Sequence, residues 1–389
     1  MSLSSAGPPG SPDLVARARG GALDALRFAA ALFVVVFHFG DEAPVALRGL
    51  HGFMERGYLA TDFFLILSGF VLAKAYGASV ASGRLGLGRF WFKRLARCYP
   101  THLITLGILV VMVVLGGAFG FHAANEGRFD LADLPAQVFL LHAFGLGGGE
   151  WNIPAWTISA LLLCYLTFPT LWRRLFLRIS SPWLAALLGL GVLFGAEVLS
   201  LLLLGQDQFS LGFQWCLFRA APLFLVGLSI ARIVQTARFG GGVARVIGLG
   251  STAVLLVNAV LLGTDLINIL AICGIIVGCG AAPVTRSLPG AEWAARMSFS
   301  LFMTHTIAGA LWFDLIARLA APMAHSDLAM WGVWSGAVVF TVLLAGAYHQ
   351  WIDDPIQRAI QARFFTRRPS PGAVMTPRPV RRPEPAPSA

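Results

Sequence analysis

The stretch LDALRFAAALFVVVFHFG, from Leu23 to Gly40, is apolar enough to span a membrane, yet it contains Arg27 and His38. These two positions are about three turns of α-helix apart, so both side chains lie on one face, roughly 16 Å from each other along the axis. An ionisable side chain inside a membrane-spanning helix is energetically unfavourable, so its presence there indicates a functional role by default. The alternative is that Arg27 is an ordinary cytoplasmic anchor and His38 an interfacial histidine.

The composition of the whole chain indicates a membrane protein. Of its 389 residues, 57% are hydrophobic and only 12% are charged, whereas soluble domains contain about 25% charged residues. The net charge of +10 does not indicate nucleic-acid binding, because the cations lie between apolar runs and in the C-terminal tail rather than on one basic module. The five cysteines form neither a CxxC pair nor a cluster with zinc-ligand spacing, so we expect no metal site.

The apolar runs predict an all-α integral membrane protein with about ten transmembrane helices, each close to the ~20 residues that cross the hydrocarbon core. The predicted spans lie at about 23–40, 57–76, 98–119, 154–172, 183–204, 212–231, 246–262, 267–285, 298–316 and 329–351. A further apolar piece, from Leu134 to Phe144, is too short to cross. We expect it to lie at the membrane interface or to re-enter the membrane.

The distribution of basic residues predicts the orientation. If the N-terminus is cytoplasmic, the predicted outside loops contain only Arg48, Arg56, Arg128 and Arg318 as basic residues. The positive-inside rule therefore places both termini in the cytoplasm. Residues 1–22 are predicted to be a flexible cytoplasmic leader, 23–358 the transmembrane domain, and 359–389 a disordered, Pro/Arg-rich cytoplasmic tail without apolar periodicity.

Asp62 is an acidic residue inside the second predicted span, GYLATDFFLILSGFVLAKAY. Counted from the outer ends of their spans, Asp62 and His38 differ in depth by only a few Å, at about 1.5 Å per residue. A carboxylate beside an imidazole can fix its tautomer and stabilise its charged form, so Asp62 is predicted to orient His38 as a base. The alternative is that Asp62 caps the start of its helix.

The inside loop GRLGLGRFWFKRLARCYP contains the strongest basic cluster of the chain. Arg94 and Arg97, spaced i, i+3, share one helix face at the cytoplasmic mouth of the third span. Arginine forks suit phosphates, and a helix N-terminus also attracts anions. Plain positive-inside topology explains most basic loops and is the alternative here.

Three further polar or aromatic side chains lie within predicted spans. Trp156 and Ser159 belong to the fourth span and His305 to the ninth. An aromatic belt accounts for Trp156 equally well, and helix–helix hydrogen bonds account for Ser159 and His305. At the inner end of the last span, Asp353 and Asp354 offer a carboxylate that can neutralise one of the basic loops.

These residues, taken in order, resemble the membrane-bound acyltransferase type 3 family, whose bacterial members O-acylate sugars, polysaccharides and some antibiotics. The resemblance covers about Leu23 to Arg358 and rests on five elements: Arg27 followed after ten residues by His38, the D-x-F-F-type run Asp62 to Phe70, which has one residue fewer between Asp and Phe than that pattern, the R-x-x-R-x-x-P element Arg94, Arg97 and Pro100, the run Ser298 to His305, and Asp354–Pro355. A second departure matters more. The family commonly has a glutamate after W-S/T-L-S-V, and this chain has Leu161 at that position.

The resemblance implies transfer of an acyl group, most often acetyl, from cytosolic acyl-CoA to a hydroxyl of a sugar, polysaccharide precursor or other small acceptor at a bacterial inner membrane. It implies no metal. The phosphates of coenzyme A would dock on Arg94 and Arg97, with Arg27 in the same path. His38, with Asp62, would act as general base, and Trp156, Ser159 and His305 would contact the acceptor.

Two other functions stay open at this point. Intramembrane His, Asp and Arg residues can form a proton relay, so a proton-coupled transporter is one alternative. A non-catalytic partner in a polysaccharide export complex is the other, since the family glutamate is missing. In all three cases the partners are a small-molecule or carbohydrate ligand and membrane lipid, not nucleic acid.

Overall fold

The structure is a computed structural model that describes residues 21–119, 129–147, 151–282, 284, 287–316 and 326–365. Within these ranges all regular elements are helices. The predicted leader lies outside the described residues apart from its last two positions, and so does the predicted tail beyond residue 365.

Each of the ten predicted spans coincides with a helix. These helices are α2 (Ala22–His38), α4 (Tyr58–Ala81), α5 (Leu87–Ala118), α7 (Ala155–Arg174), α8 (Pro182–Leu204), α9 (Cys216–Ala237), α10 (Gly241–Val260), α11 (Asp265–Ala281), α12 (Ala291–Leu311) and α14 (Asp327–Tyr348). Seven described helical segments, which contain α4, α5, α7, α8, α9, α10 and α14, are long and apolar enough to cross a membrane. The all-α, multi-pass class is therefore confirmed, whereas the count of ten and the side of the termini stay predictions.

The other three helices are shorter or more polar. α2 and α11 have 17 residues each, which is slightly short of the ~20 that a perpendicular crossing needs. α12 has 21 residues but buries several polar side chains, among them Ser298, Thr304 and His305. Both hydroxyls and the His305 Nδ1 hydrogen-bond to backbone carbonyl oxygens of α12 itself.

Short elements connect and extend the long helices. Before α4 lie α3 (Leu47–Leu50) and the 3₁₀ helix Gly52–Arg56, and the apolar piece before α7 forms α6 (Leu134–Val138) and the 3₁₀ helix Leu141–Phe144. The π-helical turns Trp312–Ile316 and His349–Asp353 follow α12 and α14, and the last described helix is α15 (Asp354–Phe364).

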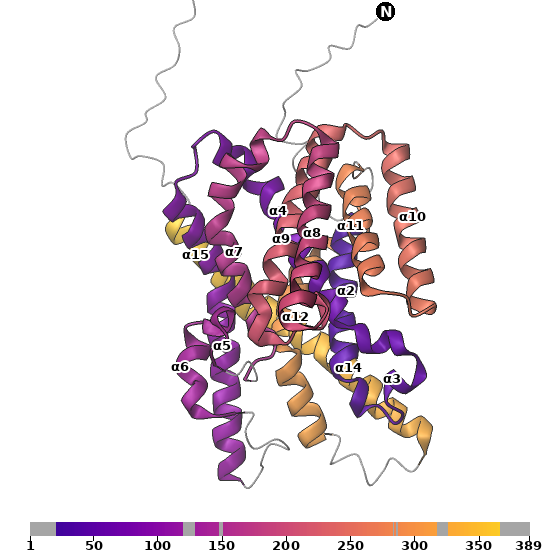
Figure 1. Ribbon diagram of the computed structural model, residues 1–389. Helices are drawn as coiled ribbons and strands as arrows, with labels where there is room; N and C mark the ends of the chain where they lie inside the picture. Colours follow the sequence, from indigo (N-terminus) through magenta and orange to yellow (C-terminus); the bar gives the residue numbers. More distant parts are fainter. Residues whose placement is uncertain are drawn as a thin grey trace, which may run out of the picture.

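The centre of the bundle is a close crossing of α4 and α9, which lie side by side in Figure 1. Glycines make this approach possible. A Cβ atom at Gly69 would lie 2.2 Å from the carbonyl oxygen of Phe224, and one at Gly227 would lie 2.0 Å from that of Ile66. Small residues at helix crossings let backbones approach in this way inside membranes.

Burial separates central from peripheral helices. In each of α4, α7 and α9, 56% of the most apolar 18-residue stretch is buried, against 17% in α10, which lies at one edge of the bundle (Figure 1). The exposed leucines and valines of α8 and α10 suit a lipid environment. Polar side chains are therefore concentrated between α2, α4, α5, α7, α9 and α12, where the candidate site lies.

Candidate active site

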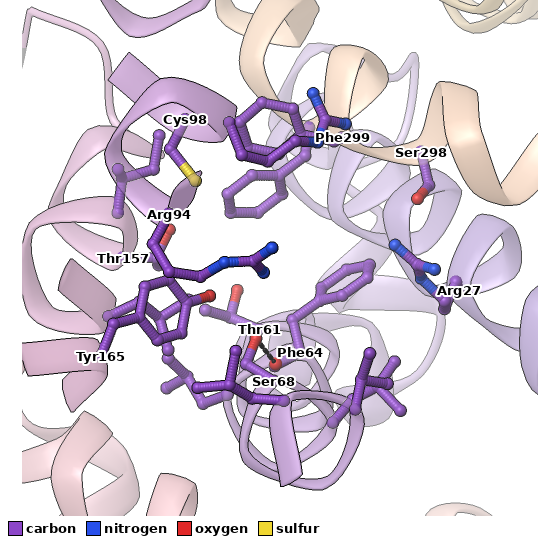
Figure 2. A pocket seen from close by; sticks show the side chains of 18 residues that line it. Arg27, Thr61, Phe64, Ser68, Arg94, Cys98, Thr157, Tyr165, Ser298 and Phe299 are labelled. Atoms are coloured by element: carbon purple, nitrogen blue, oxygen red, sulfur yellow. Dashed lines mark hydrogen bonds between the residues drawn. The ribbon is translucent and has the colours of Figure 1, made fainter. Parts of the chain in front are cut away.

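A cavity of about 220 Å³ lies between α2, α4, α5, α7 and α12. We call it the inner cavity, because it is close to the helix ends that are predicted to face the cytoplasm. Its lining contains Arg27, Arg94 and Arg97, so the structure brings all three predicted anion-binding arginines together. Figure 2 shows the Arg94 guanidinium projecting into this space, with Arg27 on the opposite side.

The three arginines have different partners. Arg94 donates from Nη2 to the Tyr76 hydroxyl at 2.6 Å and lies over its ring. Arg27 has Asp24 at a long 3.9 Å, and Arg97 donates from Nη1 to Asp353 at 3.0 Å. Among the described residues, Arg97 is thus the one of the three with a close carboxylate, and the cavity keeps a positive charge that suits an anion.

Leu161 also lines the inner cavity. This is the position where a glutamate is common in the family that the sequence resembles. With leucine there, α7 contributes no carboxylate from this position to a cavity that contains three arginines. The departure from the family motif therefore makes the cavity more electropositive.

A second, larger cavity of about 510 Å³ lies between α2, α4, α7, α9 and α12. We call it the outer cavity, because His38 ends α2 on the side predicted to be outside. His38, Trp156 and His305, three of the predicted site residues, line it together with Tyr58, Arg219 and several apolar side chains. A mostly apolar lining with a few convergent polar groups is typical of a small-molecule site.

The two histidines face the outer cavity as a pair. Their ring centroids lie 4.8 Å apart. His38 Nδ1 is 2.9 Å from the Val34 carbonyl oxygen, and His305 Nδ1 is 2.8 Å from that of Phe302. A carbonyl oxygen only accepts, so each neutral ring has its proton on Nδ1 and its lone pair on Nε2. His305 Nε2 is buried and has no hydrogen-bond partner among the described residues.

The two cavities share two lining residues, Thr61 of α4 and Phe302 of α12. A path from the three arginines to the two histidines would therefore pass between these side chains. Helix α2 extends along both cavities, with Arg27 at the inner one and His38 at the outer one. The two residues for which the sequence predicts a shared helix face thus line two adjoining cavities.

Comparison with known proteins identifies the protein family. A family model described as an acyltransferase domain matches residues 21–349. The chain belongs to the acyltransferase type 3 family. It is an enzyme class that transfers acyl groups, and the resemblance drawn from the sequence motifs is confirmed.

The chain is also similar to two known proteins. The chain is 27% identical to the "Acyltransferase MdmB" of Streptomyces mycarofaciens, over 88% of this chain and 92% of that protein. It is 38% identical over 136 residues to "Protein 2 in picA locus" of Rhizobium radiobacter, an alignment that covers 34% of this chain and 63% of that protein. No solved structure matches the chain.

In this acyltransferase, the structure gives Asp62 a partner other than the predicted one. Its Oδ1 and Oδ2 accept from Nε and Nη2 of Arg219, each at 2.9 Å. Asp62 is fully buried, and Arg219 also lies over the Tyr58 ring at 5.2 Å. A carboxylate in a bundle core needs a cation, and the intramembrane Arg219 supplies it. The geometry therefore does not support Asp62 as the group that orients His38.

Ser159 lies outside the two cavities described above. Its hydroxyl donates to the Leu140 carbonyl oxygen and accepts from the Ala143 N–H at 2.9 Å. Ser159 therefore joins α7 to the segment after α6. The predicted contact of Ser159 with the acceptor is not supported, because this hydroxyl is used within the fold.

Sequence reasoning missed Arg219, Tyr58 and Thr61 as site residues. A signal for Arg219 was present: two oppositely charged side chains within spans, Asp62 and Arg219, favour each other as partners. Nothing in the sequence signals Thr61, because its place between the two cavities depends on how α4 packs against α12.

Proposed function

We propose that this acyltransferase moves an acetyl group, or another short acyl group, from cytosolic acyl-CoA to a hydroxyl of a sugar, polysaccharide precursor or other small acceptor at a bacterial inner membrane. The observation that supports this most is the pair of adjoining cavities, one with three arginines and the other with two histidines. The polyanionic end of the donor and the acceptor hydroxyl would occupy different cavities.

At the inner cavity, Arg94, Arg97 and Arg27 would bind the phosphates of the donor. Arginine is suited to this role because its planar fork of donors matches phosphate oxygens and is always charged. The slender acyl-bearing arm would then extend between Thr61 and Phe302, so that its thioester reaches the outer cavity.

At the outer cavity, His38 Nε2 would accept the proton of the acceptor hydroxyl. The oxygen then attacks the thioester carbonyl carbon, the new C–O ester bond forms, and the C–S bond breaks. The proton held by His38 passes to the departing thiolate, which balances the step. His305 would accept a hydrogen bond from the acceptor at its own Nε2, and Trp156 would pack against the acceptor's apolar face.

Thiol release from acetyl-CoA by the detergent-purified protein tests this proposal. We expect turnover in the wild type, loss of turnover with retained binding in His38→Ala, and weakened binding in Arg94→Ala/Arg97→Ala. His51→Ala and Arg48→Ala are matched controls, because both side chains are exposed and lie outside the two cavities. A wild type that neither binds nor consumes acetyl-CoA would contradict the donor assignment.

A further inference from the structure

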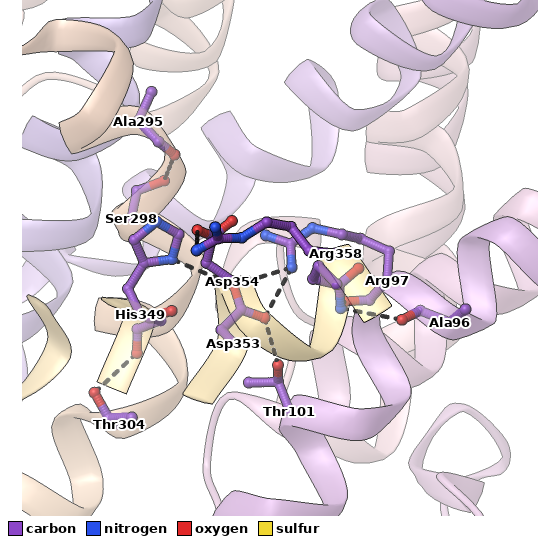
Figure 3. Close-up of polar contacts among 12 residues, drawn as sticks. Ala96, Arg97, Thr101, Ala295, Ser298, Thr304, His349, Asp353, Asp354 and Arg358 are labelled. Atoms are coloured by element: carbon purple, nitrogen blue, oxygen red, sulfur yellow. Dashed lines mark hydrogen bonds and ion pairs between the residues drawn. The ribbon is translucent and has the colours of Figure 1, made fainter. Parts of the chain in front are cut away.

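Asp353 is a buried carboxylate that contacts Arg97 of the inner-cavity lining, and 1% of its side chain is exposed. It accepts from Arg97 Nη1 at 3.0 and 3.2 Å, one distance for each oxygen, and from the Thr101 hydroxyl at 2.9 Å. His349 Nδ1 lies 3.4 Å from it (Figure 3). Its oxygens are therefore directed at α5, which carries the arginines.

The neighbouring Asp354 differs from Asp353 in every one of these respects. It is 40% exposed and pairs with Arg358, one turn further along α15, at 2.6 Å. In Figure 3, dashed lines join Asp353, and not Asp354, to Arg97 and Thr101. Two adjacent aspartates thus have separate roles, which the sequence alone does not distinguish.

The backbone explains this separation. His349–Asp353 is a π-helical turn, and α15 begins directly after it with Pro355 in its first turn. Proline has no N–H, so an α-helical bond from residue 355 to the carbonyl four residues earlier cannot form. Single π turns are frequent at functional sites, and their extra residue rotates the following side chains relative to the preceding helix.

Arg97 is held from two directions. Asp353 uses only its Nη1, and the Phe299 ring lies under the guanidinium at 4.8 Å. The Asp353 bonds thus leave Nε and Nη2 of Arg97 outside the ion pair, and Arg97 is part of the inner-cavity lining. A fixed guanidinium of this kind loses less freedom when it binds a phosphate than a mobile one does.

We infer that Asp353, presented by the π turn before Pro355, is a positioning residue that fixes Arg97 for the anionic end of the donor. This rests on the proposed function of the inner cavity. Arg94 differs, because its close partner is the neutral Tyr76 hydroxyl. Asp353 therefore controls the geometry of one anion-binding arginine, whereas Arg94 contributes its charge to the cavity.

The test compares Asp353→Asn with Asp354→Asn in the full-length purified protein. We expect Asp353→Asn to raise the KM for acetyl-CoA in the thiol-release assay about tenfold with little change in kcat, because a charge-assisted contact that holds Arg97 is lost. Asp354→Asn is the matched control, with the same chemical change one residue away, and its KM should stay within about twofold of wild type. Thermal midpoints of all variants identify any general loss of stability.

Two further variants test the inference even if Asp353→Asn does not fold. Thr101→Val removes one donor to Asp353, and Pro355→Ala restores the N–H whose absence favours the π turn. Both should raise KM in the same direction by a smaller factor. Equal KM values in Asp353→Asn and Asp354→Asn, or a lower thermal midpoint with unchanged KM, would overturn the inference. A wild type that does not bind acetyl-CoA would instead overturn the proposed function.

Discussion

The imidazole rings of His38 and His305 lie 4.8 Å apart, and each has its Nδ1 beside a backbone carbonyl oxygen of its own helix. In each neutral ring Nε2 therefore carries the lone pair, and both residues line the same cavity, although they come from helices far apart in the sequence. Two neutral imidazoles in this arrangement can accept two protons or hydrogen bonds from one polyhydroxyl acceptor, one as a base and one as an anchor.

Substitutions of His38 and of His305 are expected to have different kinetic effects. His38→Ala should lower kcat about 10²- to 10⁴-fold, because it removes general-base catalysis. His305→Phe should chiefly raise the KM for the acceptor, and His305→Gln, which keeps an acceptor oxygen, should be milder. Steady-state kinetics with a hydroxyl acceptor measure both constants. A larger fall of kcat in His305→Phe than in His38→Ala would reverse the assignment.

The Asp62–Arg219 pair predicts strong coupling between these positions. Arg219→Met alone leaves a fully buried carboxylate without its cation and should destabilise the fold by about 3–5 kcal/mol. The double variant Asp62→Leu/Arg219→Met should recover most of this loss, because apolar side chains replace both charges. Thermal unfolding of the wild type, both single variants and the double variant in detergent gives the coupling. Additive effects would contradict the ion pair as the main role of Asp62.

An acidic residue at position 161 of α7 is expected to change the affinity for acetyl-CoA. Leu161→Glu would place a carboxylate among Arg27, Arg94 and Arg97 and should weaken acetyl-CoA binding about tenfold at low salt, since opposite charges at short range compete with the phosphates. Leu161→Gln is the neutral control of nearly equal size. If both variants bind equally, charge in the inner cavity does not determine donor affinity.

His142, which precedes α7 in the 3₁₀ helix Leu141–Phe144, predicts a pH dependence of stability. Burial lowers the pKa of His142 to about 4, from about 6.5 in an unfolded chain. The folded state thus favours the neutral ring. The contribution of His142 to the free energy of unfolding is complete above about pH 6.5 and is lost as the pH falls toward 4, by about 1.4 kcal/mol per pH unit. His142→Gln should reduce the fall in thermal midpoint between pH 7.5 and 5; an unchanged pH profile would count against this origin.

Much of the fold was predictable because a membrane imposes its own rule on the sequence. Backbone groups in hydrocarbon must be satisfied within a helix, so apolar runs of suitable length become helices with little ambiguity. The ten predicted spans accordingly coincide with ten helices. The same rule makes intramembrane charges conspicuous, which is why Arg27 and His38 were identified from α2 alone.

The partners of those charges were decided by tertiary structure. Similar depths within their spans predicted that Asp62 lies next to His38. In the structure α4 and α9 cross closely at their glycines, and the Asp62 carboxylate pairs with Arg219 of α9 instead. The π turn likewise selects Asp353 rather than Asp354 for Arg97. The sequence determined which side chains lie within spans and at about what depth. Only helix packing, which sets rotation and neighbours, determined which of them meet.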